Sequence, residues 1–509
     1  MLSESKQRRI GAILSYISIF FSIAISIIYT PILTSKLGQA EYGIFSFANS
    51  TIGYLQILDL GLGSTIIIFV SKAIKNREVD KEKKLYGMFL TIYIIMAVIA
   101  FIFGIVLANN VAILFNKETT NQQLELAKYM FYLLALNLAI TFPGSVFNNI
   151  IMAHEKFVYA KSLSIISTLL KPILVIPGLL LGQRSLFVVL TITAINLFVI
   201  LSNIYFCIKV IRIKFIFNSW DKLLLKSIFS FSVWVALQEI IDKVNWSLDN
   251  FIIGKISGVV AVSVYAVAAH INRLYISFST AISGVLVPKI SKIAEEKENS
   301  NQRFTDIMTN TGRIQLYIVG LILSGFIIFG RNFIILWVGN DYEEAYIIAI
   351  ALMFPMTLSL IQNTGGAILK AKNKHKFMTL VYLFIAVVNV IISIPLVKLY
   401  GGIGAAFGTG ISLFLGNWII KNIYYQKIIK LDIIYFFKKI LNIFIIQIFL
   451  TVIAYFIVIR LNINSWLYLL CGIISHVIIY GLIMYLTLGE YEKNIINDFK
   501  NKFFMRKSH

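Results

Sequence analysis

Charged residues are scarce in this sequence, and cysteine is scarcer still. Of the 509 residues, 14% are charged and 58% are hydrophobic. Soluble globular domains carry about 25% charged residues, so this balance is typical of a polytopic membrane protein. The two cysteines, Cys207 and Cys471, both lie in apolar segments. We therefore expect neither a disulfide framework nor a metal site.

Motifs of soluble catalytic domains are also missing. The sequence contains no P-loop, no HExxH, no GxSxG and no cluster of histidine and cysteine. The longest stretch between apolar runs, residues 289–313, is too short to bury a hydrophobic core of its own. We therefore expect no enzyme, no bound cofactor and no ATP-driven pump in this chain. A gradient of H+, Na+ or substrate, or the membrane potential, would supply the energy for any transport.

The net charge of +22 does not indicate nucleic acid as a partner. Nucleic-acid-binding modules gather Lys and Arg on one face, whereas the basic residues here sit in short loops between apolar runs. The basic segment 1–9 precedes the first apolar run, and no small-residue cleavage site closes that run. We expect the run to be a retained first span and the surrounding lipid to be the main partner.

Apolar runs of the length that a helix needs to cross a bilayer recur from one end of the chain to the other. They predict an all-α polytopic membrane protein with fourteen transmembrane helices. The predicted spans are 11–34, 43–70, 86–108, 127–150, 162–182, 185–207, 225–254, 258–288, 313–335, 345–369, 377–398, 402–423, 437–459 and 464–488.

The distribution of Lys and Arg supports this count. With the first residue inside the cell, the cytoplasmic segments hold 35 of the 46 Lys and Arg, the outer loops hold eight, and three lie within spans. Adding or removing one span would destroy the alternation. By the positive-inside rule, both termini are expected in the cytoplasm of a cell whose plasma membrane holds the protein.

The chain also repeats itself at an offset of 220 residues. Gly38 aligns with Gly258, Phe157 with Phe377, and Gly182 with Gly402. This pattern predicts two six-helix repeats, related by a pseudo-two-fold axis along the membrane normal, plus two C-terminal helices. The expected domains are an N-terminal lobe (1–217), a C-terminal lobe (218–431), and a last pair of spans with a basic tail (432–509).

The segment 226–255 is the most unusual predicted span, because it is apolar yet carries four charged residues in its interior. Glu239, Asp242, Lys243 and Asp249 fall within an arc of roughly 120° at helical spacing. Lipid does not solvate such groups, so they must face other helices or a water-filled cavity. Four charges exceed the needs of one helix contact and favour a polar pathway. The alternative is that Asp242 and Lys243 only pin neighbouring helices together.

Three further charged side chains lie within predicted spans. Arg273 and Lys171 are cations that could bind a phosphate or pyrophosphate group, as could Lys243. Asp59, like Glu239, Asp242 and Asp249, could couple transport to H+ or Na+ or act in gating. A structural alternative for Asp59 is equally favoured: it pairs with a cation or caps a helix broken at the glycines that follow. His270 is expected to be a packed, hydrogen-bonded side chain.

Two short motifs in the first spans resemble a known family. The segment Leu37-Gly38-Gln39-Ala40-Glu41-Tyr42-Gly43-Ile44-Phe45, followed by Leu58-Asp59-Leu60-Gly61, is similar to the N-terminal signature of bacterial oligosaccharide and polysaccharide flippases. These are the Wzx-type proteins of the multidrug/oligosaccharidyl-lipid/polysaccharide (MOP) exporter superfamily. The predicted pattern of spans agrees with that family over the whole chain.

The resemblance implies a function and partners. Such flippases move an undecaprenyl-pyrophosphate-linked oligosaccharide across the bacterial plasma membrane by alternating access, for O-antigen or capsule biosynthesis. The lipid-linked oligosaccharide would be the substrate, and a polysaccharide polymerase and chain-length proteins would be partners. A lipid II flippase and an ion-coupled multidrug exporter of the same superfamily remain alternatives. A membrane-embedded glycan polymerase or transferase is disfavoured, because it would need a sizeable outer loop.

Overall fold

The protein is all-helical over the residues described in a computed structural model: 4–217, 222–284, 290, 293, 300–372, 374–461, 463–494 and 497. Eleven helical stretches of this part of the chain are long and apolar enough to cross a membrane. Two of them, Ile10–Lys75 and Lys376–Ile429, are divided by a sharp turn at Gly38 or Gly401. The all-α polytopic fold is therefore confirmed, and the total of fourteen spans stays a prediction.

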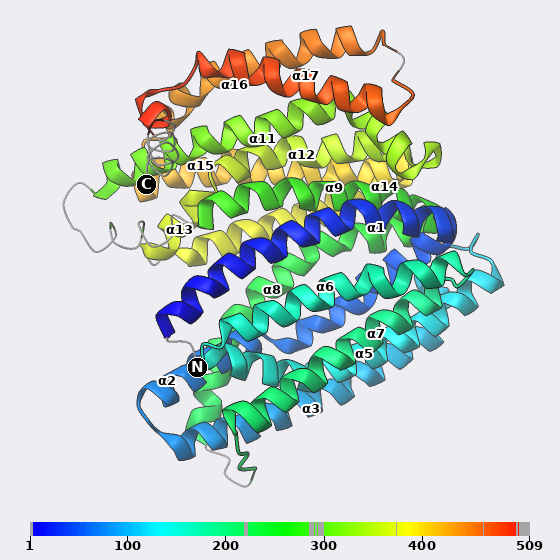
Figure 1. Cartoon of the computed structure of the whole chain (residues 1–509), viewed down its shortest axis with the longest axis vertical. Coiled ribbons are helices and arrows are strands. Elements are labelled where there is room, and N and C mark those ends of the chain that lie inside the picture. The colour runs from blue at the N-terminus through cyan, green and yellow to red at the C-terminus, as the bar shows by residue number, and fades with distance from the viewer. Residues whose placement is uncertain are drawn as a thin grey trace, which may run out of the picture. The chain divides into compact units, whose positions relative to one another are not determined.

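The chain divides into two compact units, Met1–Ser263 and Val264–His509. The helices of unit 1 are labelled in Figure 1. In order, they are α1 (Glu4–Tyr54), the 3-10 helix η1 (Leu55–Asp59), α2 (Leu62–Lys75), α3 (Val79–Asn109), α4 (Val111–Leu114), α5 (Asn121–Ala153), α6 (Phe157–Leu180), α7 (Ser185–Tyr205), the π-helix η2 (Phe206–Ile211) and α8 (Lys222–Ile256). The helix α9 (Gly258–Gly284) begins in unit 1 and continues into unit 2.

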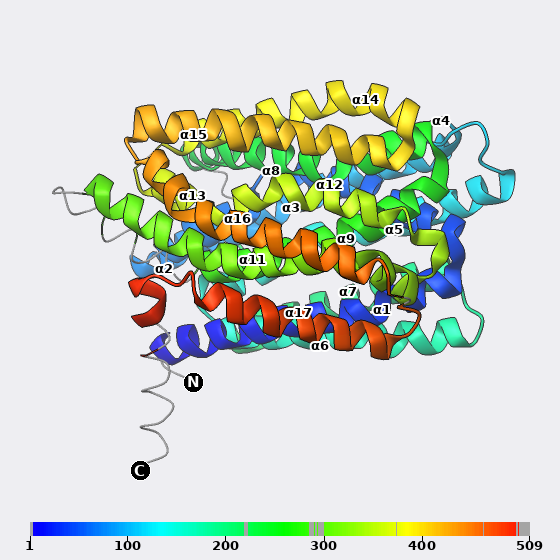
Figure 2. The same ribbon diagram turned by 90° about the horizontal axis from the view of Figure 1, so that it is seen from above.

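Unit 2 contains the rest of α9 and the remaining helices. These are α11 (Ser300–Val338), the 3-10 helix η3 (Asn340–Tyr342), α12 (Ala345–Ile361), α13 (Asn363–Ala371), α14 (His375–Leu413), the π-helices η4 (Phe414–Ile420) and η5 (Tyr425–Ile429) with α15 (Lys421–Tyr424) between them, α16 (Ile433–Val458) and α17 (Trp466–Tyr485). The last two helices both pack on α11, and Figure 2 shows α16 and α17 running beside it. The predicted boundaries of the lobes stay a prediction.

Large apolar side chains cover much of the helix surface, as lipid-facing helices require. On α3, for example, Ile94, Ile95, Val98 and Ile102 are exposed, whereas Tyr93 is buried. The polar groups of these helices face inward, because a backbone or side-chain donor without a partner in hydrocarbon costs several kcal/mol. This inverted distribution places the polar residues that could carry function inside the helix bundles.

Local geometry supports the predicted repeat. Gly38 and Gly258 both have positive φ angles, of 75° and 84°, so glycine permits the same sharp turn at both aligned positions. Later in the repeat the offset is 218 rather than 220 residues. The stacked rings of Tyr159 and Phe206, 3.8 Å apart, correspond to those of Phe377 and Tyr424, 3.4 Å apart.

The same offset relates the ends of the sixth helix of each repeat. The π-helices η2 and η5 both end at a basic residue in the left-handed region, Arg212 (φ 62°) and Lys430 (φ 60°). The left-handed turn that was expected at Gly402 lies one residue earlier, at Gly401 (φ 56°). Two insertions or deletions between the halves account for this shift in register.

Candidate functional site

The first candidate region is a break in the second predicted span. The 3-10 helix η1 ends at Asp59, Leu60 and Gly61 then adopt left-handed conformations, and α2 starts afresh at Leu62. Asp59 Oδ2 accepts a hydrogen bond from the Gly63 backbone N–H at 3.4 Å. This carboxylate therefore caps the start of α2, where backbone N–H groups have no partner within the helix.

Asp59 also joins this break to α3. The Tyr93 hydroxyl donates to Asp59 Oδ1 at 2.5 Å. A side chain at Gly63 would lie 3.1 Å from Nδ2 of Asn149 on α5, so glycine allows the three helices to approach closely here. The structural role expected for Asp59, a cap on a broken helix, is thus present, and a role in ion coupling stays a prediction.

The described part of the polar face of α8 lies against the end of α1 and against η1. Lys243 Nζ donates to Gln56 Oε1 at 2.8 Å, and Asn250 Nδ2 donates to Ser50 Oγ at 2.8 Å. Asp249 is 4% exposed, and its charge acts on the hydroxyl group of Tyr54. We call this contact the α1–α8 seam.

The α1–α8 seam shows that Lys243 and Asn250 connect helices, which is the structural role weighed against a polar pathway. Two further residues of the predicted cluster, Glu239 and Asp242, have side chains that lie outside the described residues. Their predicted role therefore stays untested. A hydroxyl contact between Thr65 of α2 and Ser232 of α8, 3.0 Å long, extends the connection toward the other end of α8.

The two predicted mid-span cations, Lys171 and Arg273, are both exposed. Lys171 lies on α6 in unit 1, and Arg273 lies on α9 in unit 2. His270 is close enough to Arg273 for their charges to interact, and its ring is nearly parallel to that of Trp337 at 6.3 Å. The predicted cavity with Asp59 and Arg273 on opposite walls stays a prediction.

Sequence reasoning missed a buried carboxylate within the quoted motif. Glu41 is 8% exposed and accepts hydrogen bonds from the backbone N–H of Ser185 at 2.8 Å, from the Ser185 hydroxyl, and from Arg184 Nε at 2.7 Å. Because α7 begins at Ser185, the carboxylate also meets the positive end of its helix dipole. The opposite charges of Glu41 and Arg184, each at an outer end of a predicted span, were the available signal.

A second buried ion pair, also missed, lies in unit 2. Arg313 Nε on α11 contacts Glu492 Oε1 at 2.6 Å, and the two side chains are 13% and 5% exposed. The same guanidinium donates to the backbone carbonyls of Lys439 and Thr487, at 2.8 and 3.1 Å. It therefore joins the start of α16 and the segment after α17 to α11. Among the described residues, no group of three His, Cys, Asp or Glu side chains could hold a metal ion.

The sequence matches a family model described as polysaccharide biosynthesis protein, over residues 10–294. A protein of Shigella flexneri named as an O-antigen transporter is 23% identical over 399 residues, which cover 77% of this chain and 91% of that protein.

Solved structures show the same fold. A lipid II flippase, MurJ, in an inward closed conformation has a TM-score of 0.72 and 17% identity, and the match covers 94% of this chain and 98% of that one. An inward-facing multidrug resistance transporter of the MATE family and MOP superfamily has a TM-score of 0.61 and 14% identity, with 79% and 96% covered. At this level of identity, the likeness concerns the fold.

Proposed function

Because the chain belongs to the family of polysaccharide biosynthesis proteins, we propose that it is a Wzx-type flippase that moves an undecaprenyl-pyrophosphate-linked oligosaccharide across the membrane by alternating access. The observation that carries this proposal is the family match over residues 10–294, more than half of the chain. The fold shared with a lipid II flippase supports it, because both substrates would be lipid-linked glycans. The chain would act as a transporter and not as an enzyme.

The location follows from the same reasoning. A chain with eleven described apolar spans resides in a membrane, and the excess of Lys and Arg on one side favours the bacterial inner membrane with both termini in the cytoplasm. A polysaccharide polymerase and chain-length proteins would take up the product on the outer side.

A lipid-linked pyrophosphate needs cationic side chains along its path, because its charge is costly in a medium of low dielectric constant. Arg273 can bind a phosphate group through two parallel hydrogen bonds, whereas Lys171 supplies a point charge. Lys243 gives one of its three donors to Gln56 in the α1–α8 seam and adds a third positive charge. These three side chains are the proposed pyrophosphate ligands.

Loss of Arg273 is expected to abolish glycan export. In a strain that lacks its own flippase, Arg273→Ala should leave no surface glycan and should accumulate the lipid-linked precursor on the inner leaflet. Arg273→Lys should keep part of the export, because the charge survives without the paired hydrogen bonds. Lys171→Ala should be milder than Arg273→Ala. The measurements are surface glycan, precursor and the abundance of each variant in the membrane.

Normal export by the double variant Arg273→Ala, Lys171→Ala would contradict this assignment of ligands. It would leave the proposed function intact. By contrast, a wild-type chain that does not restore surface glycan in any flippase-deficient strain, although present in the membrane, would contradict the function itself.

Asp59 separates a structural role from a coupling role. Asp59→Asn should reach the membrane at the normal level, because an amide oxygen can still accept the hydrogen bonds from Tyr93 and Gly63. The variant cannot ionise, so we expect it to lose export if H+ or Na+ is bound at this carboxylate, as we propose. Tyr93→Phe is the matched control, since it removes one hydrogen bond and keeps the charge. Normal export by Asp59→Asn would exclude the coupling role.

A lipid II flippase is the second candidate, favoured by the TM-score of 0.72. The two functions differ in the strain that the chain rescues. A lipid II flippase would restore growth when the cell's own lipid II flippase is depleted, whereas the proposed flippase would restore surface polysaccharide without restoring growth.

A further inference from the structure

A histidine, a glutamate and a tyrosine meet where α5 ends and α3 begins. His154 follows the last residue of α5, and its Nε2 lies 2.8 Å from the Tyr86 hydroxyl oxygen and 3.4 Å from Glu82 Oε1. Tyr86 also donates a hydrogen bond to Glu82 Oε1. The side chains of His154 and Glu82 are only 18% and 19% exposed. We call these three residues the His154 site; no role discussed above uses it.

The hydrogen-bond roles in this site follow from counting protons. The Tyr86 hydroxyl has one proton, which it gives to Glu82, so His154 Nε2 must be the donor to the hydroxyl oxygen. Both the neutral tautomer with a proton on Nε2 and the imidazolium ion can donate this bond. The imidazolium alone adds attraction to the carboxylate, and hydrogen bonds between charged groups are roughly twice as strong as neutral ones.

Other ionisable groups around the site are few. Lys83, on the same helix as Glu82, acts on Glu82 and pairs with Asp80 at 3.1 Å. From the π-helix η2, the Cys207 thiol lies near Tyr86. The neighbouring helix α2 contributes the Ser71 hydroxyl, which donates to the Ala153 carbonyl at 3.2 Å. The segment after η2 donates the backbone N–H of Ile216 to the Lys83 carbonyl.

Unit 2 has a counterpart of this site at the same offset of 218 residues. Lys372, just after α13, corresponds to His154, and Phe304 near the start of α11 corresponds to Tyr86. Lys372 Nζ lies over the Phe304 ring at 5.2 Å and donates to Asn301 Oδ1. Each repeat thus uses a basic side chain at this position to hold two helix ends together.

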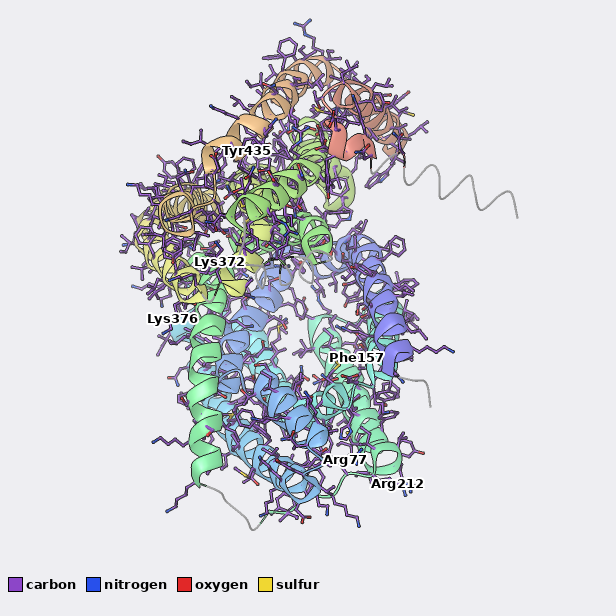
Figure 3. All side chains as sticks on the ribbon, turned by 90° about the vertical axis from the view of Figure 1, so that its left-hand side faces the viewer. Arg77, Phe157, Arg212, Lys372, Lys376 and Tyr435 are labelled. Atoms are coloured by element: carbon purple, nitrogen blue, oxygen red, sulfur yellow. The ribbon has the colours of Figure 1, made fainter. Side chains whose placement is uncertain are left out.

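The two sites differ in the range of pH over which they change charge. Burial lowers the pKa of Lys372 from its ordinary value of 10.5, but lysine titrates well above the range of pH 5 to 8 in which histidine changes charge. Figure 3 views the end of the molecule that carries Lys372 in unit 2 and, in unit 1, Phe157, which follows His154 by three residues. By the predicted topology, this end faces the cytoplasm.

We propose that the His154 site binds a proton from the cytoplasm and that the bound proton fastens the end of α5 to the start of α3. The sign follows from the partner: the charged imidazole gains from Glu82, so the connection is strongest at low pH and weakens as pH rises through the histidine range. Acidification of the cytoplasm would then slow any rearrangement of this end of unit 1. The proposal does not depend on the identity of the transported molecule.

Hydrogen exchange of the full chain in lipid nanodiscs tests the proposal. We compare amide protection at the end of α5 between the wild type and His154→Gln, each at about pH 6 and about pH 8. Glutamine keeps a neutral donor, and comparison at equal pH removes the intrinsic pH dependence of exchange. The wild type should be about fivefold better protected than His154→Gln at the lower pH, and equally protected at the higher one.

Two variants serve as controls. His154→Lys, which copies the residue of unit 2, should be better protected than His154→Gln at both pH values. Lys372→Gln should weaken protection at the end of α13 to the same extent at both pH values, because lysine does not titrate between them. A ratio of wild type to His154→Gln that does not change with pH would overturn the proposal. No transport is measured, so failure here would leave the proposed function standing.

Discussion

Replacement of Gly43 by alanine should remove most of the folded protein from the membrane. An added Cβ would lie 1.9 Å from the carbonyl oxygen of Val259 and 2.7 Å from its carbonyl carbon. Both atoms belong to the backbone, so no side-chain rotation relieves the clash, and α1 would have to move away from the start of α9. Overpacking of a core typically costs about 1–3 kcal/mol, and a clash between backbones belongs at or above the upper end of that range.

The measurements for Gly43→Ala are abundance in the membrane and the midpoint of thermal unfolding in detergent. Gly481→Ala on α17 is the matched control, because nothing lies within 4 Å of its added Cβ. Alanine also favours a helix over glycine, so this control should be at least as stable as the wild type. Equal midpoints for Gly43→Ala and Gly481→Ala would show that α1 and α9 do not approach as described.

Loss of the buried ion pair in unit 2 is expected to have an effect of similar size. Arg313→Ala would leave Glu492, which is 5% exposed, without its counter-charge. It would also remove the donors to the carbonyls of Lys439 and Thr487. Breaking a buried pair by removing one partner typically costs about 3–5 kcal/mol. We expect this loss in unfolding measurements and, in addition, easier detachment of α16 and α17 from α11.

A double-mutant cycle isolates the pair. Glu492→Gln keeps an acceptor for Arg313 but removes the charge, so it should cost less than Arg313→Ala. The double variant should cost clearly less than the sum of the two single variants, because the second substitution removes a charge that is already unpaired. Strict additivity would contradict a direct interaction. Glu490→Gln, two residues away on an exposed position, is the control for charge alone.

Features that depend on neighbouring residues could be predicted from the sequence. Apolar length and the alternation of basic residues predict the all-α membrane fold. The sharp turns at Gly38 and Gly258 were predictable as a repeat, because a left-handed backbone selects glycine at both positions. The break after Asp59 likewise follows from two glycines close together and a residue able to cap.

Contacts between distant residues could not be predicted in this way. Glu41 and Arg184 are 143 residues apart, and Arg313 and Glu492 are 179 apart. Nothing in the local pattern of either carboxylate says which cation it meets, because the choice depends on how whole helices pack. The same holds for Lys243, whose partner Gln56 lies on an element 187 residues away. The polar face of α8 was visible in the sequence, but the helix that it faces was not.

The pairing of Arg313 with Glu492 has a consequence for the order in which the protein is made. Ribosomes add about 5–20 residues per second, so the 179 residues between the two side chains take roughly 10–40 s to synthesise. During that time α11 is already made, and its arginine still lacks the carboxylate that neutralises it. Unit 1 has no such delay at its end, because Glu41 meets Arg184 well before its last helix emerges. The second half of the protein therefore stays unfinished until almost the last codon, and truncations near the C-terminus should be cleared by quality-control proteases.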